Sequence, residues 1–218
     1  MSSPRLRSDV AAIVLAAGAS TRFGPERNKL TEEIGGKPMV ACAVDAIEEA
    51  GIESTYVILG FDGPAVEAAL HGRDYHAVLN PNWERGMGGS LASGIQALPP
   101  NRFRGVLVCV ADLPDIDAQT IGRVLEQFSE SGQESSVRAS REIVVPTHAG
   151  RRGHPVLFGA AYFSELGRLA GDRGGKQILS AHPASVIEVE TDSDAILRDV
   201  DTPADLTKSR GARRQRPQ

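Results

Sequence analysis

The sequence predicts an α/β fold with a mostly parallel sheet that is covered by helices on both faces. Two observations predict this class. Apolar runs of strand length, such as VAAIVLA (10–16) and GVLVCVA (105–111), alternate with helical patterns over the first two thirds of the chain. Both runs are apolar throughout and do not alternate with polar residues, as expected of central strands that are buried on both faces.

The first two thirds of the chain divide into regular strands and helices. The helical pattern over 38–50 has Pro38 in a position that suits the first turn and Gly51 where the helix should end. Asp117 is a suitable N-cap for the amphipathic helix that follows the second apolar run. In order, we expect strands over 10–16, 54–60, 76–79, 105–111 and 142–145, and helices over 38–50, 65–70, 90–98 and 117–129.

The last third follows a looser pattern, which is typical of added strands and a small substrate-facing subregion. The polar segment 130–141 is expected to be a surface loop. Because the chain has no internal repeat and no linker rich in Pro, Gly or Ser, we interpret residues 1–207 as a single domain. The basic tail 208–218 is expected to be disordered, the alternative being an electrostatic arm for a partner. We expect further strands at 154–158, 185–190 and 197–200, and helices near 160–169 and 176–181.

Composition limits the class of protein. The chain has 218 residues, 41% of them hydrophobic, and a net charge of −4, which suits one α/β domain and does not favour nucleic-acid binding. No apolar run approaches the roughly 20 residues of a membrane span, and the first residues lack the apolar centre of a signal peptide. Cys42 and Cys109 lie inside apolar segments, as core thiols do. We therefore expect a cytoplasmic protein without a membrane or nucleic-acid partner.

Three unusual loops follow strands of the predicted sheet. LAAGASTRFGPERNKL (15–30) follows the first strand, NPNWERGMGGS (80–90) the third and ADLPDID (111–117) the fourth. Ligands of open α/β sheets bind outside the carboxyl ends of the strands. Since these ends meet at the same edge of a parallel sheet, the three loops are expected to share one site.

The first of these loops suits an anionic ligand. Gly18 can take a positive φ and lets a ligand approach the backbone, and consecutive N–H groups in such a turn form an anion-binding concavity. Arg22 and Lys29 could then neutralise a triphosphate. The spacing from Gly18 to Gly24 matches neither a Walker A loop nor a GxGxxG dinucleotide fingerprint. An ordinary strand-to-helix turn with solvated charges is the alternative.

Carboxylates after the fourth strand and near the end of the chain suit a Mg²⁺ site. Asp112 follows a buried strand, and Mg²⁺ is held by one or two carboxylates together with substrate phosphates. Asp199 and Asp201 offer the second carboxylate and would share a face if 197–200 is a strand. The alternative is that DTP (201–203) starts the last helix, with Asp or Thr as its N-cap. Both interpretations can hold together.

Further glycine-rich loops offer additional contacts. The glycines of GMGGS (86–90) permit close backbone approach, and Ser90 opens a helix whose N-terminus could bind an anion or a carbonyl oxygen. The alternative is a flexible loop in which Ser90 is only the N-cap. GRRGHPVLFG (150–159) and GDRGGK (171–176) suit a second anionic ligand, unless they are solvated surface loops. His154 is either a structural hydrogen-bonding residue or a substrate contact, and no His/Cys cluster has the spacing of a zinc site.

These motifs, in this order, resemble the nucleotidyltransferases of the MobA-like type, most closely the MocA-like branch of molybdenum cofactor cytidylyltransferases. The resemblance implies a Rossmann-like αβα sandwich that transfers a nucleotidyl group from an NTP to a phosphorylated acceptor and releases pyrophosphate. LAAG rather than LAGG resembles the cytidylyl members, which implies CTP as the nucleotide. The resemblance to the MocA-like branch implies molybdopterin or the molybdenum cofactor as the acceptor. The matching stretches, between about residues 10 and 207, are LAAGASTRFG with NKL, GGKP, NPNWERGMGGSLASG, ADLP, GRRGHPVLF, GDRGG and DVDTPADL.

The resemblance also implies a role for each matched residue. The nucleotide would be bound by Leu15, Ala16, Ala17, Gly18, Ala19, Ser20, Asn80, Gly88, Gly89 and Ser90. The catalytic residues would be Arg22 and Lys29, which hold the triphosphate, and Asp112. The cofactor Mg²⁺ would be held by Asp112 with Asp201 or Asp199. The acceptor would be contacted by Arg151, Arg152, His154, Asp172 and Arg173. A molybdoenzyme or its chaperone would be the partner that receives the product.

Three alternatives stay open at this point. An NAD(P)H-dependent oxidoreductase on the same scaffold is disfavoured because the GxGxxG motif and its acidic partner are missing. A non-catalytic nucleotide-binding regulator is disfavoured by the presence of Asp112 and Lys29. A nucleotidyltransferase that acts on another phosphorylated metabolite is also compatible with the fold. The extra residues 25–28 before Lys29 depart from the compact RxGxxK pattern of the family.

Overall fold

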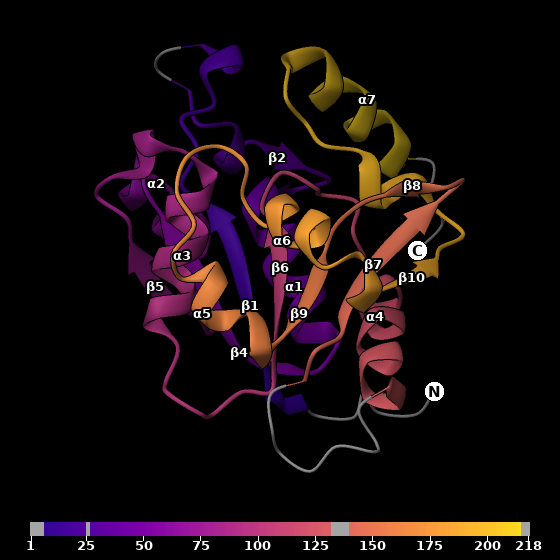
Figure 1. Ribbon diagram of the computed structural model, residues 1–218. Helices are drawn as coiled ribbons and strands as arrows, with labels where there is room; N and C mark the ends of the chain where they lie inside the picture. Colours follow the sequence, from indigo (N-terminus) through magenta and orange to yellow (C-terminus); the bar gives the residue numbers. More distant parts are fainter. Residues whose placement is uncertain (1–6, 25–26, 132–139, 215–218) are drawn as a thin grey trace.

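The chain folds into three layers, with a central sheet between two layers of helices (Figure 1). The computed structural model describes residues 7–24, 27–131 and 140–214. Within these residues the main sheet has eight strands, and most of them lie side by side in the order β10-β7-β9-β6-β1-β4-β5. Their bounds are Arg7–Ala16 for β1, Ile52–Leu59 for β4, His76–Leu79 for β5, Gly105–Val110 for β6, Ile143–His148 for β7, Val156–Gly159 for β9 and Val186–Glu190 for β10.

The strands are mostly parallel. β1 pairs in parallel with β4 and β6, β4 with β5, and β7 with β10. β9 runs antiparallel to its two neighbours, β6 and β7, and the short β8 (Arg151–Arg152) is antiparallel to β7. β2 (Glu33–Ile34) and β3 (Lys37–Pro38) form a separate antiparallel pair. The α/β class with a mostly parallel sheet, predicted from the sequence, is confirmed.

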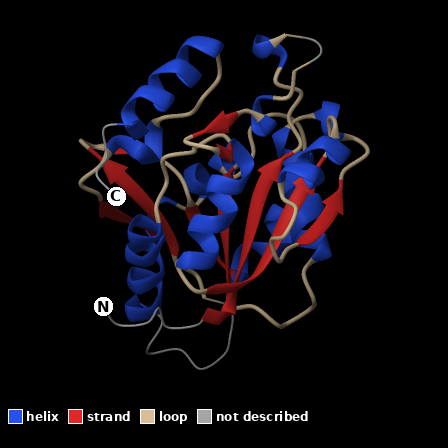
Figure 2. Ribbon diagram, turned by 180° about the vertical axis from the view of Figure 1, so that it is seen from behind, coloured by secondary structure: helices blue, strands red, loops and turns tan. Residues whose placement is uncertain are grey.

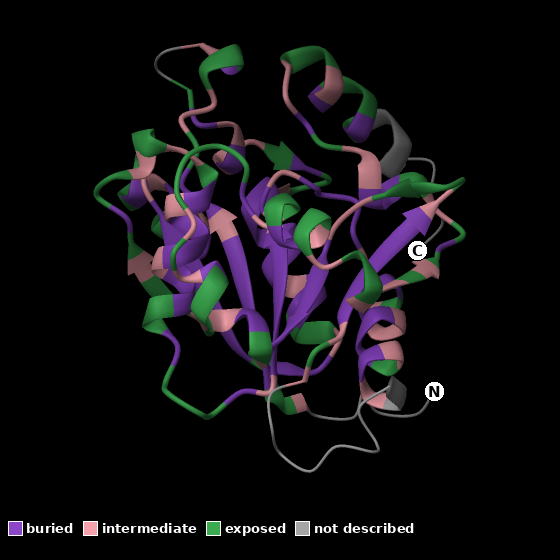
Figure 3. Ribbon diagram, viewed as in Figure 1, coloured by how far each residue is buried: buried purple, intermediate pink, exposed green. Residues whose placement is uncertain are grey.

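Alternate residues of β1 face opposite sides of the sheet, and both sides are buried (Figure 3). Val10, Ala12 and Val14 belong to one hydrophobic core, whereas Ala11 and Ile13 belong to the other. This double burial explains why the sequence of β1 is apolar without alternation.

Helices cover both cores, and Figure 2 shows the sheet from behind. The core around Val10 lies under α1, α2 and α4, and the core around Ile13 lies under α3, α5 and α6. α7 lies outside these two layers, beyond the carboxyl edge of the sheet (Figure 1). The helices are α1 (Met39–Glu49), α2 (Gly63–Ala69), α3 (Met87–Ala97), α4 (Ala118–Ser131), α5 (Phe163–Leu166), α6 (Lys176–Ala181) and α7 (Pro203–Arg214).

Most predicted elements are present, some with shifted ends. The N–H of Thr120 donates to Oδ1 of Asp117 (2.8 Å), which confirms Asp117 as the N-cap of α4. Pro38 belongs to β3 and precedes the first turn of α1, so its predicted place inside that turn is wrong. The helix expected near 160–169 is a 3₁₀ turn at Ala160–Tyr162 followed by the short α5.

Two further segments of the structure differ more strongly from the prediction. No strand forms at 197–200, because the chain crosses the end of β6 there, where the N–H of Val200 donates to the carbonyl of Asp112 (3.0 Å). The tail is not disordered from residue 208 onward, since α7 continues to Arg214 and Arg210 donates to the carbonyl of Glu33 (2.8 Å).

The ends of the remaining predicted segments fall partly beyond the described ranges. The expected surface loop 130–141 begins inside α4, which includes residues 130–131. Residues 132–139 and 215–218 lie outside the described residues. In the ranges that the structure covers, no helix is both long and apolar enough to cross a membrane.

The two cysteines are buried and are not joined in a disulfide, as expected of core thiols. Burial raises the pKa of the Cys109 thiol to about 12, with a smaller contribution from the charge of Asp112. Since the thiolate is the nucleophilic form of cysteine, this burial disfavours a nucleophilic role for Cys109.

Candidate active site

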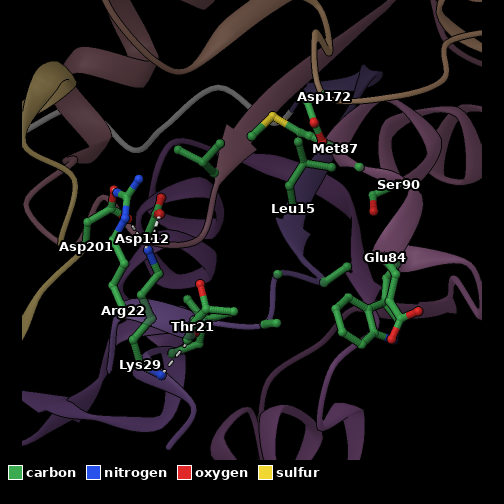
Figure 4. A pocket seen from close by; sticks show the side chains of 18 residues that line it. Leu15, Thr21, Arg22, Lys29, Glu84, Met87, Ser90, Asp112, Asp172 and Asp201 are labelled. Atoms are coloured by element: carbon green, nitrogen blue, oxygen red, sulfur yellow. Dashed lines mark hydrogen bonds and ion pairs between the residues drawn. The ribbon is translucent and has the colours of Figure 1, made fainter. Parts of the chain in front are cut away.

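Loops at the carboxyl edge of the sheet surround a cavity of about 560 Å³ (Figure 4), referred to below as the first cavity. Its walls come from the segment after β1, the turn after β5, the start of α3, the end of β6 and the segment before α7. The loops that the sequence singled out after the first, third and fourth predicted strands therefore meet at one cavity. The lining residues are Leu15, Ala17, Gly18, Ala19, Ser20, Thr21, Arg22, Lys29, Leu30, Trp83, Glu84, Gly86, Met87, Ser90, Val110, Asp112, Asp172 and Asp201.

Four charged residues, Arg22, Lys29, Asp112 and Asp201, lie together at one side of the first cavity (Figure 4), and we call them the charged cluster. Nζ of Lys29 lies 2.7 Å from Oδ2 of Asp112 and 2.7 Å from Oδ1 of Asp201. Nη1 of Arg22 lies 2.6 Å from the other carboxylate oxygen of Asp201. Figure 4 shows Glu84 at the opposite side of the cavity.

The backbone around Lys29 is held by local contacts. The side chain of the buried Asn28 accepts a hydrogen bond from the N–H of Leu30 (3.1 Å), which caps a 3₁₀ turn at Lys29–Thr31. Leu30 is itself buried, and the N–H of Lys29 donates to Oγ of Ser20 (3.3 Å). The extra residues 25–28 therefore end in a buried anchor that directs Lys29 toward the carboxylates.

The cluster changes the proton affinities of its members. Burial alone would lower the pKa of Lys29, but the charges and hydrogen bonds of Asp112 and Asp201 outweigh it and raise that pKa above its usual value. Lys29 is therefore a fixed cation at neutral pH. Burial raises the pKa of Asp199, and the neighbouring charges of Asp201 and Asp112 raise it further.

The structure brings Asp201, rather than Asp199, against Lys29 and into the first cavity. The reason lies in the start of α7. The N–H of Asp205 donates to Oγ1 of Thr202 (3.3 Å) and the N–H of Thr202 donates to Oδ2 of Asp205 (3.1 Å), which is a reciprocal capping arrangement. Because Thr202 caps the helix, the carboxylate of Asp201 is available to the cavity.

The pair of Asp112 and Asp201 fits a Mg²⁺ site of the kind that substrate phosphates complete. Both carboxylates contact one cation, the ammonium of Lys29, so they are close enough to share a metal ion. Among the described residues, no group of three or more His, Cys, Asp or Glu side chains is arranged to hold a metal. A closed, all-protein metal site is thus absent from this part of the chain, whereas Mg²⁺ typically uses one or two carboxylates plus phosphates.

The turn after β5 is organised around Asn80. Its buried amide donates to Oγ of Ser90 (3.0 Å) and accepts from the N–H of Asn82 (3.0 Å). Asn80 does not line the first cavity, so it positions Ser90, which does. The ring of Trp83 packs edge-on against Phe61, with centroids 5.7 Å apart.

The last two glycines of GMGG lie inside a helix and not in a loop as expected. α3 begins at Met87, so Gly88 and Gly89 lie in its first turn and Ser90 is not the N-cap. The N–H of Gly88 donates to the carbonyl of Gly171 (2.8 Å), and a Cβ at Gly88 would lie 2.8 Å from that same oxygen. Gly88 therefore permits contact between two loops, whereas a Cβ at Gly89 would meet nothing within 4 Å.

A second cavity of about 390 Å³ adjoins the first, and Leu15, Met87 and Asp172 line both. Its wall includes the basic residues Arg152, Arg173 and Lys176, and an apolar floor. The apolar part consists of Leu15, Met87, Leu91, Val108, Val145, Val156, Phe158 and Leu179.

The structure brings together most, but not all, of the predicted acceptor residues. Arg152, His154, Asp172 and Arg173 line the second cavity, whereas Arg151 is exposed and does not. Nδ1 of His154 is buried without a hydrogen-bond partner among the described residues. Burial lowers the pKa of His154, against weaker opposing effects of a backbone hydrogen bond and nearby carboxylates, so the ring is neutral at pH 7.

Several lining residues were not singled out in the sequence. Trp83 and Glu84 belong to the NPNWERGMGGS motif and line the first cavity. Trp83 could have been predicted as a site residue, because it is the single tryptophan of the chain and lies in a glycine-rich loop. Thr21 and Met87 likewise stand beside residues that were named. Conversely, Ala16 was expected to bind the nucleotide, but it is buried in β1 and does not line the first cavity.

Comparisons with known proteins agree with this geometry. The sequence profile of the MobA-like NTP transferase domain matches residues 12–186. Nicotine blue oxidoreductase of Paenarthrobacter nicotinovorans is 28% identical over 194 residues, which cover 88% of this chain and 92% of that protein. The bifunctional protein GlmU of Mycobacterium sp. (strain KMS) is 32% identical over 157 residues, which cover 69% of this chain but only 31% of GlmU.

Among solved structures, Rv0371c of Mycobacterium tuberculosis H37Rv superposes with a TM-score of 0.78 at 25% identity, covering 94% of this chain and 98% of that chain. The same protein in complex with manganese gives a TM-score of 0.73 at 26% identity, with the same coverage.

The matched domain, together with a mostly parallel αβα sandwich and a cation–carboxylate cluster at the carboxyl edge of its sheet, identifies a protein of the nucleotidyltransferase class. The domain match spans most of the chain, and the protein belongs to the MobA-like NTP transferase family. The resemblance to the MobA-like family stated from the motifs and the predicted enzyme class, a nucleotidyltransferase, are thereby confirmed.

Proposed function

We propose that this protein transfers CMP from CTP to a phosphorylated acceptor, such as molybdopterin or the molybdenum cofactor, with Mg²⁺ as cofactor and release of pyrophosphate. The observation that carries the proposal is the charged cluster, in which Lys29 joins Asp112 and Asp201 beside the loop that follows β1. Two cations and two carboxylates at the mouth of a glycine-containing turn suit a triphosphate with its metal. The choice of CTP rests on the LAAG motif.

Each part of the first cavity has a task in this proposal. When bound, Mg²⁺ on Asp112 and Asp201 would supply charge neutralisation for the phosphates. Arg22 and Lys29 would stabilise the negative charge of the leaving pyrophosphate. The turn at 17–20 would offer backbone N–H groups, and the side of the cavity with Trp83 would take the base. The acceptor phosphate is itself an ionised nucleophile, so no side chain has to act as a general base.

The second cavity supports an acceptor that is both phosphorylated and partly apolar. Arg152, Arg173 and Lys176 offer positive charge for a phosphate, and the apolar floor suits a ring system. Because Leu15 and Asp172 line both cavities, the acceptor phosphate and the nucleotide would meet at the boundary between them. Positioning of the reacting groups contributes much of the rate enhancement in phosphoryl-type transfer.

The test is a panel of CTP, GTP, ATP and UTP with Mg²⁺, each combined with molybdopterin, molybdenum cofactor or a set of sugar phosphates. Pyrophosphate release is measured, and the product is identified by mass. We expect release only with CTP and a molybdopterin-type acceptor. Release with a sugar phosphate would favour the alternative of another phosphorylated metabolite, and no release with any pair would contradict the proposal.

A second candidate is an NAD(P)H-dependent oxidoreductase, which one comparison favours. A relative that aligns over most of the length of both chains is named nicotine blue oxidoreductase. Loss of NADPH absorbance in the presence of nicotine blue tests this function directly. The Asp112→Asn variant separates the two candidates, because it should strongly impair nucleotidyl transfer while leaving a hydride transfer that needs no metal unchanged.

A further inference from the structure

We propose that Lys29 is the resident cation of the carboxylate pair in the nucleotide-free protein, so that a divalent metal enters this site only together with a nucleotide. The phosphates of the nucleotide would draw Lys29 away from Asp112 and Asp201 and free both carboxylates for the metal. This inference rests on the proposed function only for the identity of the ligand that releases Lys29.

The geometry assigns this place to Lys29. Its ammonium lies 2.7 Å from one oxygen of Asp112 and 2.7 Å from one oxygen of Asp201, which is between the two groups that would hold the metal. The side chain of Lys29 is only 12% exposed, so water screens these contacts weakly. The ammonium therefore stands where a metal ion would bind.

The charges of the cluster make the Lys29 ammonium a strong competitor of a divalent metal ion for the two carboxylates. In the nucleotide-free protein the two carboxylates of the charged cluster are balanced by the two cations, because Arg22 also contacts Asp201 (2.6 Å). A divalent ion added to this balanced group would lie within a few ångströms of Lys29 and be repelled. Metal and ammonium can share the site only if a further anion arrives, and a triphosphate supplies several negative charges.

The local structure allows Lys29 to move without unfolding its loop. Asn28, Leu30 and Ser20 hold the backbone on both sides of Lys29. The ammonium itself stands on a flexible four-carbon stem with three donor hydrogens, so it can exchange carboxylate partners for phosphate partners by rotation of side-chain bonds. The carboxylates keep their positions, because Asp112 lies in the turn directly after the buried strand β6, where its carbonyl accepts from the N–H of Val200, and Asp201 precedes the cap of α7.

The experiment measures Mn²⁺ binding to nucleotide-free protein by the loss of the free-ion EPR signal. Wild type should bind Mn²⁺ weakly, and Lys29→Met should bind it at least about tenfold more tightly, because the competing charge is removed. Lys29→Arg keeps the charge and should remain weak. Lys37→Met is the matched control, since Lys37 pairs with Asp45 instead, and its affinity should equal that of wild type. Unchanged or weaker binding by folded Lys29→Met would overturn the proposal.

A measurement on wild type keeps the proposal testable even if Lys29→Met does not fold. The ¹⁵N signal of the Lys29 ammonium, assigned with the Lys29→Arg variant, should stay in place when Mg²⁺ alone is added and shift when Mg²⁺ and CTP are added together. A shift with Mg²⁺ alone would contradict the inference. Neither readout needs catalytic turnover, so a failure here is distinct from a failure of the nucleotidyltransferase assay.

Discussion

The backbone N–H of Gly88 donates to the carbonyl oxygen of Gly171 at 2.8 Å. This bond joins the first turn of α3, next to the first cavity, to the loop that carries Asp172. Because Asp172 lines both cavities, the Gly88–Gly171 contact positions the wall between the proposed nucleotide and acceptor sites. Two glycine-rich motifs that are far apart in the sequence therefore act as one structural unit.

Gly88→Ala should weaken the contact between the first turn of α3 and the loop at Gly171. The added methyl group would lie 2.8 Å from the carbonyl oxygen of Gly171, and forcing in a methyl group of this kind costs roughly 1–3 kcal/mol. We expect a lower free energy of unfolding in urea and weaker binding of both substrates by calorimetry. Gly89→Ala is the matched control, because its methyl group meets nothing within 4 Å and alanine favours a helix. Equal effects of the two substitutions would argue against the contact.

The two carboxylates that contact Lys29 should matter more for catalysis than Asp199. Asp112→Asn and Asp201→Asn each remove one charge of the proposed metal site, and we expect kcat/KM to fall by about 10²–10³-fold, which is typical of losing one preorganised electrostatic group. Asp199→Asn should cost less than about tenfold, since Asp199 does not line the first cavity. Steady-state pyrophosphate release measures all three, and circular dichroism checks that each variant is folded. If Asp199→Asn were as impaired as Asp112→Asn, the assignment of Asp201 would be wrong.

Local patterns predicted the sheet and one half of the first cavity. The apolar runs at 10–16 and 105–111 are central strands because both faces of the sheet are covered. Gly18 and Arg22 follow the first strand directly, so strand direction alone places them at the carboxyl edge. The position of Lys29 depends further on the buried anchors Asn28 and Leu30, whose effect is not visible as a motif.

Contacts between distant segments could not be predicted in this way. The choice between Asp199 and Asp201 needed the conformation of 197–200, which crosses the end of β6 instead of forming a strand. The glycine at position 88 suited a ligand as well as a neighbouring loop, because both need the absence of a side chain. Only the approach of Gly171 distinguishes the two.

Trp83 should report nucleotide binding. It is the single tryptophan of the chain and lines the first cavity on the proposed base side, so a base that stacks near the indole should change its fluorescence. We expect a saturable intensity change on titration with CTP and Mg²⁺, and none with inorganic tripolyphosphate, which lacks a base. Trp83→Phe should bind CTP within a few-fold of wild type by calorimetry but lose the signal. Calorimetric binding of CTP without any fluorescence change in wild type would place the base elsewhere.

His154 should contribute to loss of stability in mild acid. An unfolded histidine has a pKa of about 6.5, and burial holds the pKa of His154 below that value in the folded protein. As the pH falls from 7 through this window, the unfolded chain takes up a proton that the folded chain refuses, so stability decreases by at most about 1.4 kcal/mol per pH unit from this group. His154→Asn should therefore show a flatter dependence of unfolding free energy on pH between 7 and 5, measured by urea denaturation. The exposed His71 provides the control variant, His71→Asn, which should keep the slope of wild type. Identical slopes for wild type and His154→Asn would mean that His154 is protonated in the folded protein as readily as in the unfolded chain.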